Sequence, residues 1–540
     1  MATPNLQMIR FWFNLIAVFC GAFQVVIDSD QDNIIVVALC IAGTYICTHF
    51  LFRPRPLVHY ALSASAILVY TLSCIYVPLV AKTAEREPLT YSLRFPVKTF
   101  VYIDLVLLTY VAAFWVYSHS RFWQGWKDRI SRGILVPLGF FKEPTVAQLW
   151  VMGVVGSLAE VLIIARPDLN EQSSPVVKFI AAFVPFSFAP FLMPFSFLTS
   201  TESKVGLRQN IATLLYVPIT IVLAFAANGR VGIILPIATG VICWLLGFST
   251  NRLPKSYRRP KLIIGTIAGA ALMLPVLGTV VLAMAAARQH KGEASPIEFI
   301  QLSIQNYGDA NAIASAVYNN NADETWSEEY VHDPILTRFV AVKYHDNGFS
   351  DTASLNESAR TQAAAFMMKK IVAQLPAPVL TSLGIEISKE DYATSLGDYI
   401  HFLNTGAGIG GYRTGSLISS GVFILGPLFL PVLLILCVVF FSVLESFSLI
   451  IRKRGVGPDS VRATAGATVI FSPMILITVW PSIYNYFEFE SIGDIISVLL
   501  RSFPQQVLIY FLLYRLTSFL TTGRIISFVS RRPRVGQLPT

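Results

Sequence analysis

The sequence predicts an all-α polytopic membrane protein with about twelve transmembrane helices and one large, mostly helical extracytoplasmic loop between helices nine and ten. The 540-residue chain is 54% hydrophobic and only 14% charged, whereas soluble domains carry about 25% charged residues. Apolar runs of the length that crosses a hydrocarbon core, about 17–25 residues, recur along the chain. A polar segment at residues 288–414 interrupts them.

The apolar runs divide the chain into three parts. Residues 1–287 hold helices one to nine, residues 288–414 form the loop, and residues 415–540 hold helices ten to twelve with a basic tail. Helix six contains three prolines within ten residues, which predicts a kink or a broken helix. The twelve predicted centres lie near residues 18, 42, 70, 108, 155, 188, 218, 239, 274, 428, 472 and 512.

Charge predicts the orientation of these helices. The loop has nine Lys or Arg against fifteen Asp or Glu, a net charge of −6, so the rest of the +9 chain sums to +15. Cytoplasmic loops of membrane proteins collect Lys and Arg, and the short loops around Arg53, Arg259 and Lys453 are basic. We therefore expect both termini in the cytoplasm and the acidic loop outside. The positive charge outside the loop is then explained by the orientation of the helices and by contact with anionic lipids, and not by nucleic-acid binding.

Cysteines and motifs indicate neither a disulfide framework nor a resident cofactor. All six cysteines fall inside apolar runs, and no P-loop, Cys/His metal spacing or His-Glu-x-x-His motif is present. The pattern Asp28-Ser29-Asp30 on the first outer turn offers hard oxygen ligands for a divalent ion, but charge asymmetry explains it equally. We expect no metal and no cofactor.

Two arginines are candidates for binding an anion at the outer membrane face. Arg230 opens helix eight directly after Asn228-Gly229, and Arg413 lies where the glycine-rich end of the loop re-enters the membrane. A guanidinium group at membrane depth is costly, so it is usually paired with another group or has a function. Its planar arrangement of N–H donors allows two parallel hydrogen bonds to the oxygens of a phosphate. The alternative for both residues is an interfacial charge that marks the start of a helix.

Loop residues supply candidates for acid–base chemistry. His345 is followed by Asp346, and a histidine beside a carboxylate is able to accept a proton near neutral pH. Asp333, Asp346 and Asp398 are alternative bases. Glu160 is an intramembrane acid that could pair with Arg166 or Arg230. The predicted substrate-binding residues are Arg338, Tyr412, Asp398 and Glu160.

Two segments resemble the bacterial O-antigen, or oligosaccharide repeat-unit, polymerases, which are related in architecture to the O-antigen ligases. One is Asn228-Gly229-Arg230 ahead of an apolar run. The other is the late outer loop, with Arg338-Phe339 and later Gly411-Tyr412-Arg413-Thr414-Gly415-Ser416. The order of helices, with one long outer loop after about nine spans, is also similar to these GT-C-like proteins. The chain departs from the ligase pattern because no histidine neighbourhood matches it.

The resemblance implies a metal-independent membrane glycosyltransferase of the bacterial inner membrane. Its substrates are polyprenyl-pyrophosphate-linked oligosaccharides, which it polymerises into O-antigen, exopolysaccharide or capsule chains at the periplasmic face. Membrane lipids are expected partners, and a chain-length regulator protein is a family expectation; nucleic acid is not a partner. Arg230 and Arg413 would stabilise the departing pyrophosphate, and His345 would act as base.

Two other functions remain open from the sequence. An O-antigen ligase would use the same donor but transfer the glycan to a different acceptor. A flippase for lipid-linked sugar or polysaccharide is favoured by the number of spans and by the proline-rich helix six. A loop of this size and the lack of several intramembrane charges argue against transport.

Overall fold

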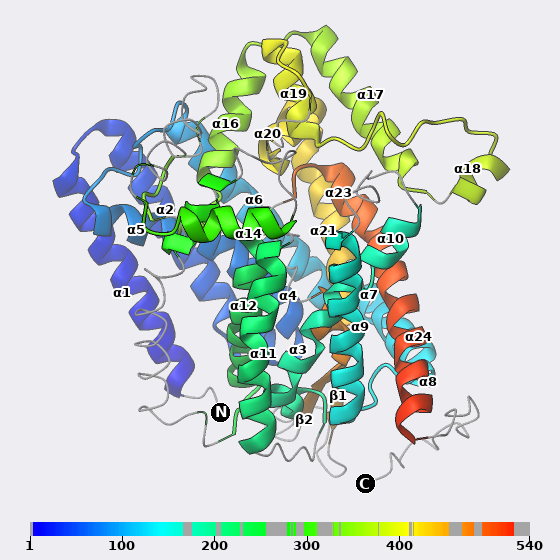
Figure 1. Cartoon of the computed structure of the whole chain (residues 1–540). Helices are drawn as coiled ribbons and strands as arrows, with labels where there is room; N and C mark the ends of the chain where they lie inside the picture. Colours follow the sequence, from blue (N-terminus) through cyan, green and yellow to red (C-terminus); the bar gives the residue numbers. More distant parts are fainter. Residues whose placement is uncertain are drawn as a thin grey trace.

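The protein is a mostly helical, multi-pass membrane protein (Figure 1). The computed structural model describes residues 4–165, 175–200, 207–226, 230–254, 296–309, 329–333, 336–375, 377–409, 415–452, 467–479 and 489–522, together with isolated positions that include 257, 278–280, 327 and 413. Within these residues, eight helices are long and apolar enough to cross a membrane.

Eight predicted spans coincide with these helices, those near residues 18, 42, 70, 108, 155, 188, 428 and 512. The two predicted spans near residues 218 and 239 fall on α11 and α12, and the span near residue 274 lies outside the described residues. The spanning elements are α1 (Pro4–Ile27), α2 (Gln31–Leu51), α4–η1–α5 (Ala61–Thr71, Leu72–Tyr76, Val77–Glu85), α6 (Pro96–His119), α9 (Val146–Ala165), η4 (Val184–Leu198), α20–η8–α21 (Leu417–Leu425, Gly426–Leu428, Phe429–Glu445) and α23–η12–α24 (Ile492–Ser497, Val498–Ser502, Phe503–Thr522).

The remaining elements are two 20-residue helices, α11 and α12, and shorter elements that connect the spans or cover their ends. They are α3 (Pro54–His59), α7 (Arg121–Asp128), η2 (Arg129–Leu135), α8 (Val136–Leu138), α10 (Pro175–Ala181), α11 (Leu207–Ala226), α12 (Arg230–Ser249), α14 (Pro296–Gln305), η7 (Leu336–Phe339), α16 (Val342–Ala353), α17 (Glu357–Ala373), α18 (Ala377–Ser382), α19 (Leu396–Thr405), β1 (Ser448–Arg452), β2 (Ala467–Phe471) and η10 (Ile475–Val479).

The two ends of the helix bundle differ (Figure 1). Helices α16, α17 and α19 of the acidic segment gather at one end, here called the loop end. Helix α1 begins and α24 ends at the opposite end, where β1 and β2 also lie. The described part of the acidic segment is largely helical, as the sequence predicts.

The proline-rich sixth span is irregular rather than a plain α-helix. Residues Val184–Leu198 form a 3₁₀ helix that contains Pro190 and Pro194, and Phe195 has non-helical backbone angles. Proline removes an amide donor and clashes with the preceding turn, so the i→i+4 ladder is not maintained. The span packs against α9, α11 and α12.

The predicted helical span centred near residue 472 is wrong at its centre. Residues Ala467–Phe471 form β2, which pairs antiparallel with β1. The Ser472 amide donates to the Phe447 carbonyl just beyond α21, while the Phe489 carbonyl accepts from Leu417 at the start of α20. The described helical part of this run, η10, begins only at Ile475, after the strand. The apolar run, rich in β-branched residues, from which a helix was predicted begins as strand β2. It does so because the apolar strand β1 offers it a pairing partner.

A polar helix joins the acidic segment to the membrane helices. Helix α16 packs against η1, α6, α19 and α20, and its Asp346 side chain is fully buried. The Asp346 carboxylate accepts the backbone amides of Arg94, at 2.9 and 3.1 Å, and of Phe95, at 2.8 Å. Lys343 is its ion-pair partner at 3.7 Å. These amides precede α6, whose first turn has no capping side chain of its own.

Replacement of Asp346 by alanine should destabilise the protein strongly. The partly buried amides of Arg94 and Phe95 would lose their side-chain acceptor. Among the described residues, Lys343 would keep only the Ser92 carbonyl. Each buried group left unsatisfied costs about 1–3 kcal/mol. We expect the free energy of unfolding to fall by roughly 3 kcal/mol, seen as a lower melting temperature in detergent. Glu357→Ala is the matched control, because that side chain is 78% exposed. Equal melting temperatures for the two variants would contradict this role of Asp346.

Candidate functional site

One face of α16 carries the polar groups of the candidate site. His345, Gly348 and Asp351 follow one another at three-residue intervals, so they lie along one side of the helix. All three meet the start of α20 or the neighbouring α19. A Cβ on Gly348 would lie 2.1 Å from the Ser419 hydroxyl oxygen, so glycine is what lets α16 approach α20 this closely.

Asp351 and His401 form a buried acid–histidine pair. Asp351 Oδ1 lies 3.0 Å from His401 Nδ1 and accepts a hydrogen bond from Asn404 Nδ2 at 3.3 Å. The two residues are 3% and 1% exposed. Burial raises the pKa of Asp351, while His401, Asn404 and the more distant Arg413 charge oppose that rise. Burial and the partners of Asp351 thus act on its pKa in opposite directions.

His345 has both ring nitrogens engaged inside the protein. Nδ1 lies 2.9 Å from the Ser416 hydroxyl oxygen, and Nε2 lies 3.7 Å from the Cys74 sulfur in η1. Burial lowers the pKa of His345 to about 4, so the ring is neutral at physiological pH. Ser416 in turn caps α20 by accepting the amide of Ser419. His345 therefore fixes the position of the serine at the helix start.

The first turn of α19 holds the backbone of Arg413. Asp398 Oδ1 accepts the Arg413 amide at 2.8 Å, and the Ser395 hydroxyl donates to the Arg413 carbonyl at 2.8 Å. A Cβ on Gly397 would lie 2.5 Å from the Gly415 nitrogen, so the chain on the way into α20 lies directly on α19. The Asp398 carboxylate thus holds the backbone of Arg413 in place, and the positive charge of Arg413 opposes the burial-induced rise in the pKa of Asp351.

A small cleft with about 10 Å³ of free space, room for about one water molecule, lies where these elements meet. It is lined by Asp351 from α16, Ile400 from α19, Ser416, Ser419 and Ser420 from α20, and the three glycines 348, 397 and 415. A carboxyl group, three hydroxyls and backbone exposed by glycine offer acceptors and donors to a hydroxylated ligand. In this cleft, polar groups of the acidic segment meet polar groups at the start of the spanning helix α20.

A second acid lies behind α20. The Ser420 hydroxyl donates to the Glu490 carbonyl at 3.0 Å. Burial raises the pKa of the Glu490 side chain to about 7, Asp494 adds to the rise, and Lys370 opposes it. Glu490 is thus a carboxyl group near its protonation midpoint at neutral pH, and its segment supports the serines of the cleft.

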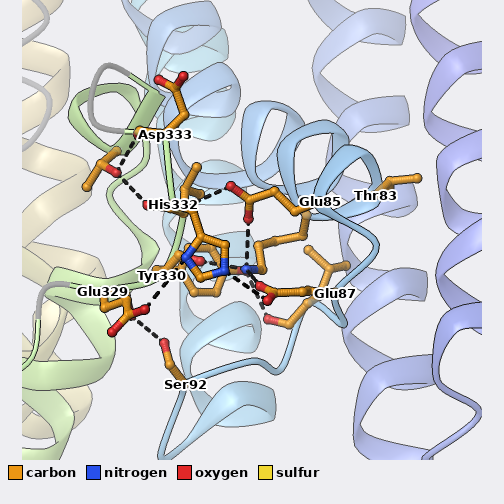
Figure 2. Close-up of polar contacts among 12 residues, drawn as sticks. Thr83, Glu85, Glu87, Ser92, Glu329, Tyr330, His332 and Asp333 are labelled. Carbon is orange, nitrogen blue, oxygen red and sulfur yellow. Dashed lines mark hydrogen bonds and ion pairs between the residues drawn. The ribbon is translucent and has the colours of Figure 1, made fainter. Parts of the chain in front are cut away.

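A separate polar cluster at the loop end ties α5 to the acidic segment (Figure 2). Lys82 is completely buried; it contacts Glu87, lies 3.0 Å from Glu85 Oε2, and donates to the Tyr330 carbonyl at 2.6 Å. His332 Nε2 lies 2.9 Å from Glu87 Oε1. The ring of Tyr91 stacks below the Lys82 ammonium at 4.3 Å.

This second cluster contains the donor set that comes nearest to a metal site among the described residues. Donor atoms of Glu85, Glu87 and His332 lie within 4.8 Å of one another. The carboxylate oxygens, however, already accept from the Lys82 ammonium, the His332 amide and the His332 ring. A positive charge occupies the position in which a divalent ion would neutralise the acids. The cluster is a structural link.

The structure brings together some of the predicted residues. His345, Asp398 and Arg413 lie around the junction of α16, α19 and α20. Asp346, an alternative base, is buried away from the cleft under α6. Asp333, another alternative, accepts the Leu336 amide at 2.8 Å.

The remaining predicted residues are not joined to this group. Arg230 is the first residue of α12 and Arg338 lies in η7, but their side chains are outside the described residues, as is Tyr412. Glu160 lies on α9, half-buried. Its predicted partners Arg166 and the Arg230 side chain also lie outside the described residues, so both pairings stay predictions.

Asp351, His401 and Glu490 are not among the site residues predicted from the sequence. The spacing His345–Gly348–Asp351 was a usable signal, because it places two titratable groups and a glycine along one side of a polar helix. His401 and Glu490 have no comparable signal. Their proximity to the cleft arises only when α19 and residues 489–490 pack around α20.

Comparison with protein-family models, with curated proteins and with solved structures finds no significant match.

The buried neutral His345 should make stability depend on pH. The unfolded chain binds a proton at this histidine below about pH 6.5, but the folded protein does so only below about pH 4. Between these values the unfolded state holds more protons, so stability falls as pH falls. The raised pKa of Glu490 acts in the opposite direction, because its folded form binds a proton at higher pH than the unfolded chain does. The stability difference between wild type and His345→Gln should therefore change by up to about 3 kcal/mol between pH 6.5 and pH 4, measured as melting temperature, and the same slope in both proteins would refute the assignment.

Proposed function

We propose that this chain is a metal-independent membrane glycosyltransferase that polymerises polyprenyl-pyrophosphate-linked oligosaccharide repeat units. The loop end would face the periplasm, and the bundle would lie in a bacterial inner membrane with both termini in the cytoplasm. The observation that carries the proposal is the cleft at the start of α20. There, a spanning helix meets a carboxyl group with a histidine partner, hydroxyl groups and the backbone next to Arg413.

The position of the cleft suits a substrate that is half lipid and half sugar. Helices α20 and α21 together form a 29-residue span, and the cleft lies at its first turn. A polyprenyl chain would remain among the spanning helices while its glycan lies among the loop helices. Serine hydroxyls and amides exposed by glycine are typical partners of sugar hydroxyls.

Asp351, held by His401, is the better general base in this proposal. It lines the cleft, whereas both ring nitrogens of His345 are engaged in the interior. Burial moves the pKa of Asp351 upward, toward the range in which a carboxylate accepts a proton effectively. His345 then acts as a positioning residue through Ser416.

The proposed reaction is a single displacement at the anomeric carbon. The terminal hydroxyl oxygen of the acceptor glycan attacks C1 of the donor glycan, and the bond between C1 and the pyrophosphate oxygen breaks. The acceptor proton passes to Asp351, and the electron pair leaves with the polyprenyl pyrophosphate. Arg413, and Arg230 and Arg338 by resemblance, would stabilise the charge on the leaving group. The cleft has about 10 Å³ of free space, so its walls would have to part to admit the reacting sugars, and holding both there would then supply orientation.

A reconstituted assay tests this proposal. The purified protein in liposomes receives polyprenyl-pyrophosphate-linked repeat units, and products are resolved by glycan length. The wild type should give a ladder. Asp351→Asn should reduce its rate by about 10²–10⁴, the typical contribution of a general base, and Arg413→Ala should leave single units unused. Glu357→Gln, an exposed change on the same segment, is the control.

The outcomes separate the alternatives. Unchanged polymer in Asp351→Asn and Arg413→Ala would remove these residues from the mechanism. In a deletion strain, loss of all polymer supports a polymerase, whereas accumulation of unattached polymer indicates a ligase. Movement of labelled lipid-linked sugar across the liposome membrane without change in glycan length would indicate a flippase, for which the irregular sixth span is the supporting feature.

A further inference from the structure

Two arginines at the opposite end of the bundle converge on one histidine. Arg10 of α1 places a guanidinium nitrogen 2.6 Å from His49 Nδ1, and Arg53, just beyond α2, places one 2.6 Å from His49 Nε2. The ring of Tyr45 lies against both His49 and the Arg10 guanidinium. Spanning helices α1 and α2 thus present two positive charges side by side where they meet the membrane boundary.

The hydrogen bonds of this group cannot all be satisfied internally. A guanidinium has only donors, and a neutral imidazole has one donor and one acceptor nitrogen. One of the two contacts therefore brings a donor against a donor, and a protonated ring would make both contacts donor against donor. Within the described part of the chain, neither arginine has an acidic side chain as ion-pair partner. The cluster lacks an acceptor with negative charge.

The surroundings of the cluster indicate a lipid rather than a soluble ligand. Large apolar side chains next to it on α1 and α2 are about half exposed: Met8 55%, Phe11 59%, Trp12 52% and Tyr45 52%. Such a surface faces acyl chains in a bilayer, and Trp and Tyr favour the headgroup region. A phosphodiester anchored by two acyl chains would contact both surfaces at once.

We propose that Arg10, His49 and Arg53 form a binding site for the phosphate of an anionic phospholipid headgroup in the leaflet opposite the loop end. The phosphate oxygens accept from the two guanidinium groups and from the imidazole N–H, so each donor gains an acceptor. The Arg10 guanidinium remains over the Tyr45 ring. The acyl chains lie along the exposed apolar faces of α1 and α2. This site is independent of the proposed glycosyltransferase cleft.

Lipid binding to the purified protein tests the site. Phosphatidylglycerol is titrated into the wild type, Arg10→Gln, Arg53→Gln and the double variant in detergent micelles, and binding is followed by native mass spectrometry. Each lost arginine should weaken phosphatidylglycerol binding roughly fivefold. Arg129→Gln is the matched control, because it removes one exposed arginine from a different segment. Equal affinity in the wild type and the double variant overturns the proposal.

Two further experiments identify the ligand and test the site if a variant does not fold. Inorganic phosphate at the same concentration should raise the melting temperature of the protein less than phosphatidylglycerol does. An equal rise with both would assign the site to a soluble anion instead. If a variant fails to fold, a photoactivatable phosphatidylglycerol is cross-linked to the wild type. Adducts should map to residues 8–15 and 45–53, and adducts confined to other spans overturn the proposal.

Discussion

The arrangement depends on one carboxylate from the acidic segment, that of Asp346, which binds two backbone amides in front of a spanning helix. The amides of Arg94 and Phe95 have no partner from their own turn, since α6 begins without a capping side chain. An acceptor must come from elsewhere, because a buried unpaired amide is costly. Asp346 supplies it and fixes α16 against the bundle. The face with His345, Gly348 and Asp351 then points at α20.

The polar groups at the loop end divide into two kinds by how completely they are satisfied. Asp346 and the Lys82 cluster have partners for their charges and hold the acidic segment to α5 and α6. Asp351 has a histidine partner too, but it borders a cleft beside three serines. Acidic side chains such as Asp346, surrounded by protein atoms, have a structural role. Asp351 borders the free space of the cleft and could take part in chemistry there. This contrast is why the cleft, and not the larger Lys82 cluster, is proposed as the reaction site.

The two ends of the bundle present opposite chemistry. At the loop end, acids are paired with buried cations or histidine. At the other end, Arg10 and Arg53 surround a histidine without an acid. The charge asymmetry that predicted the orientation has a local counterpart at this cluster, because its two arginines have no acid among the described ion pairs and could contact a phospholipid surface. Orientation and lipid binding would rest on the same arginines.

The sequence by itself determined the fold class, eight of the spans and the helical nature of the acidic segment, because apolar length and charge act locally and do not depend on neighbours. It also singled out His345, Asp398 and Arg413, which do lie near one another. Tertiary structure decided the rest. Whether the run before Phe471 became helix or strand depended on β1, and whether His345 or Asp351 faced the cleft depended on α20 and η1. Burial and partners are set by segments distant in the chain, and composition does not encode them.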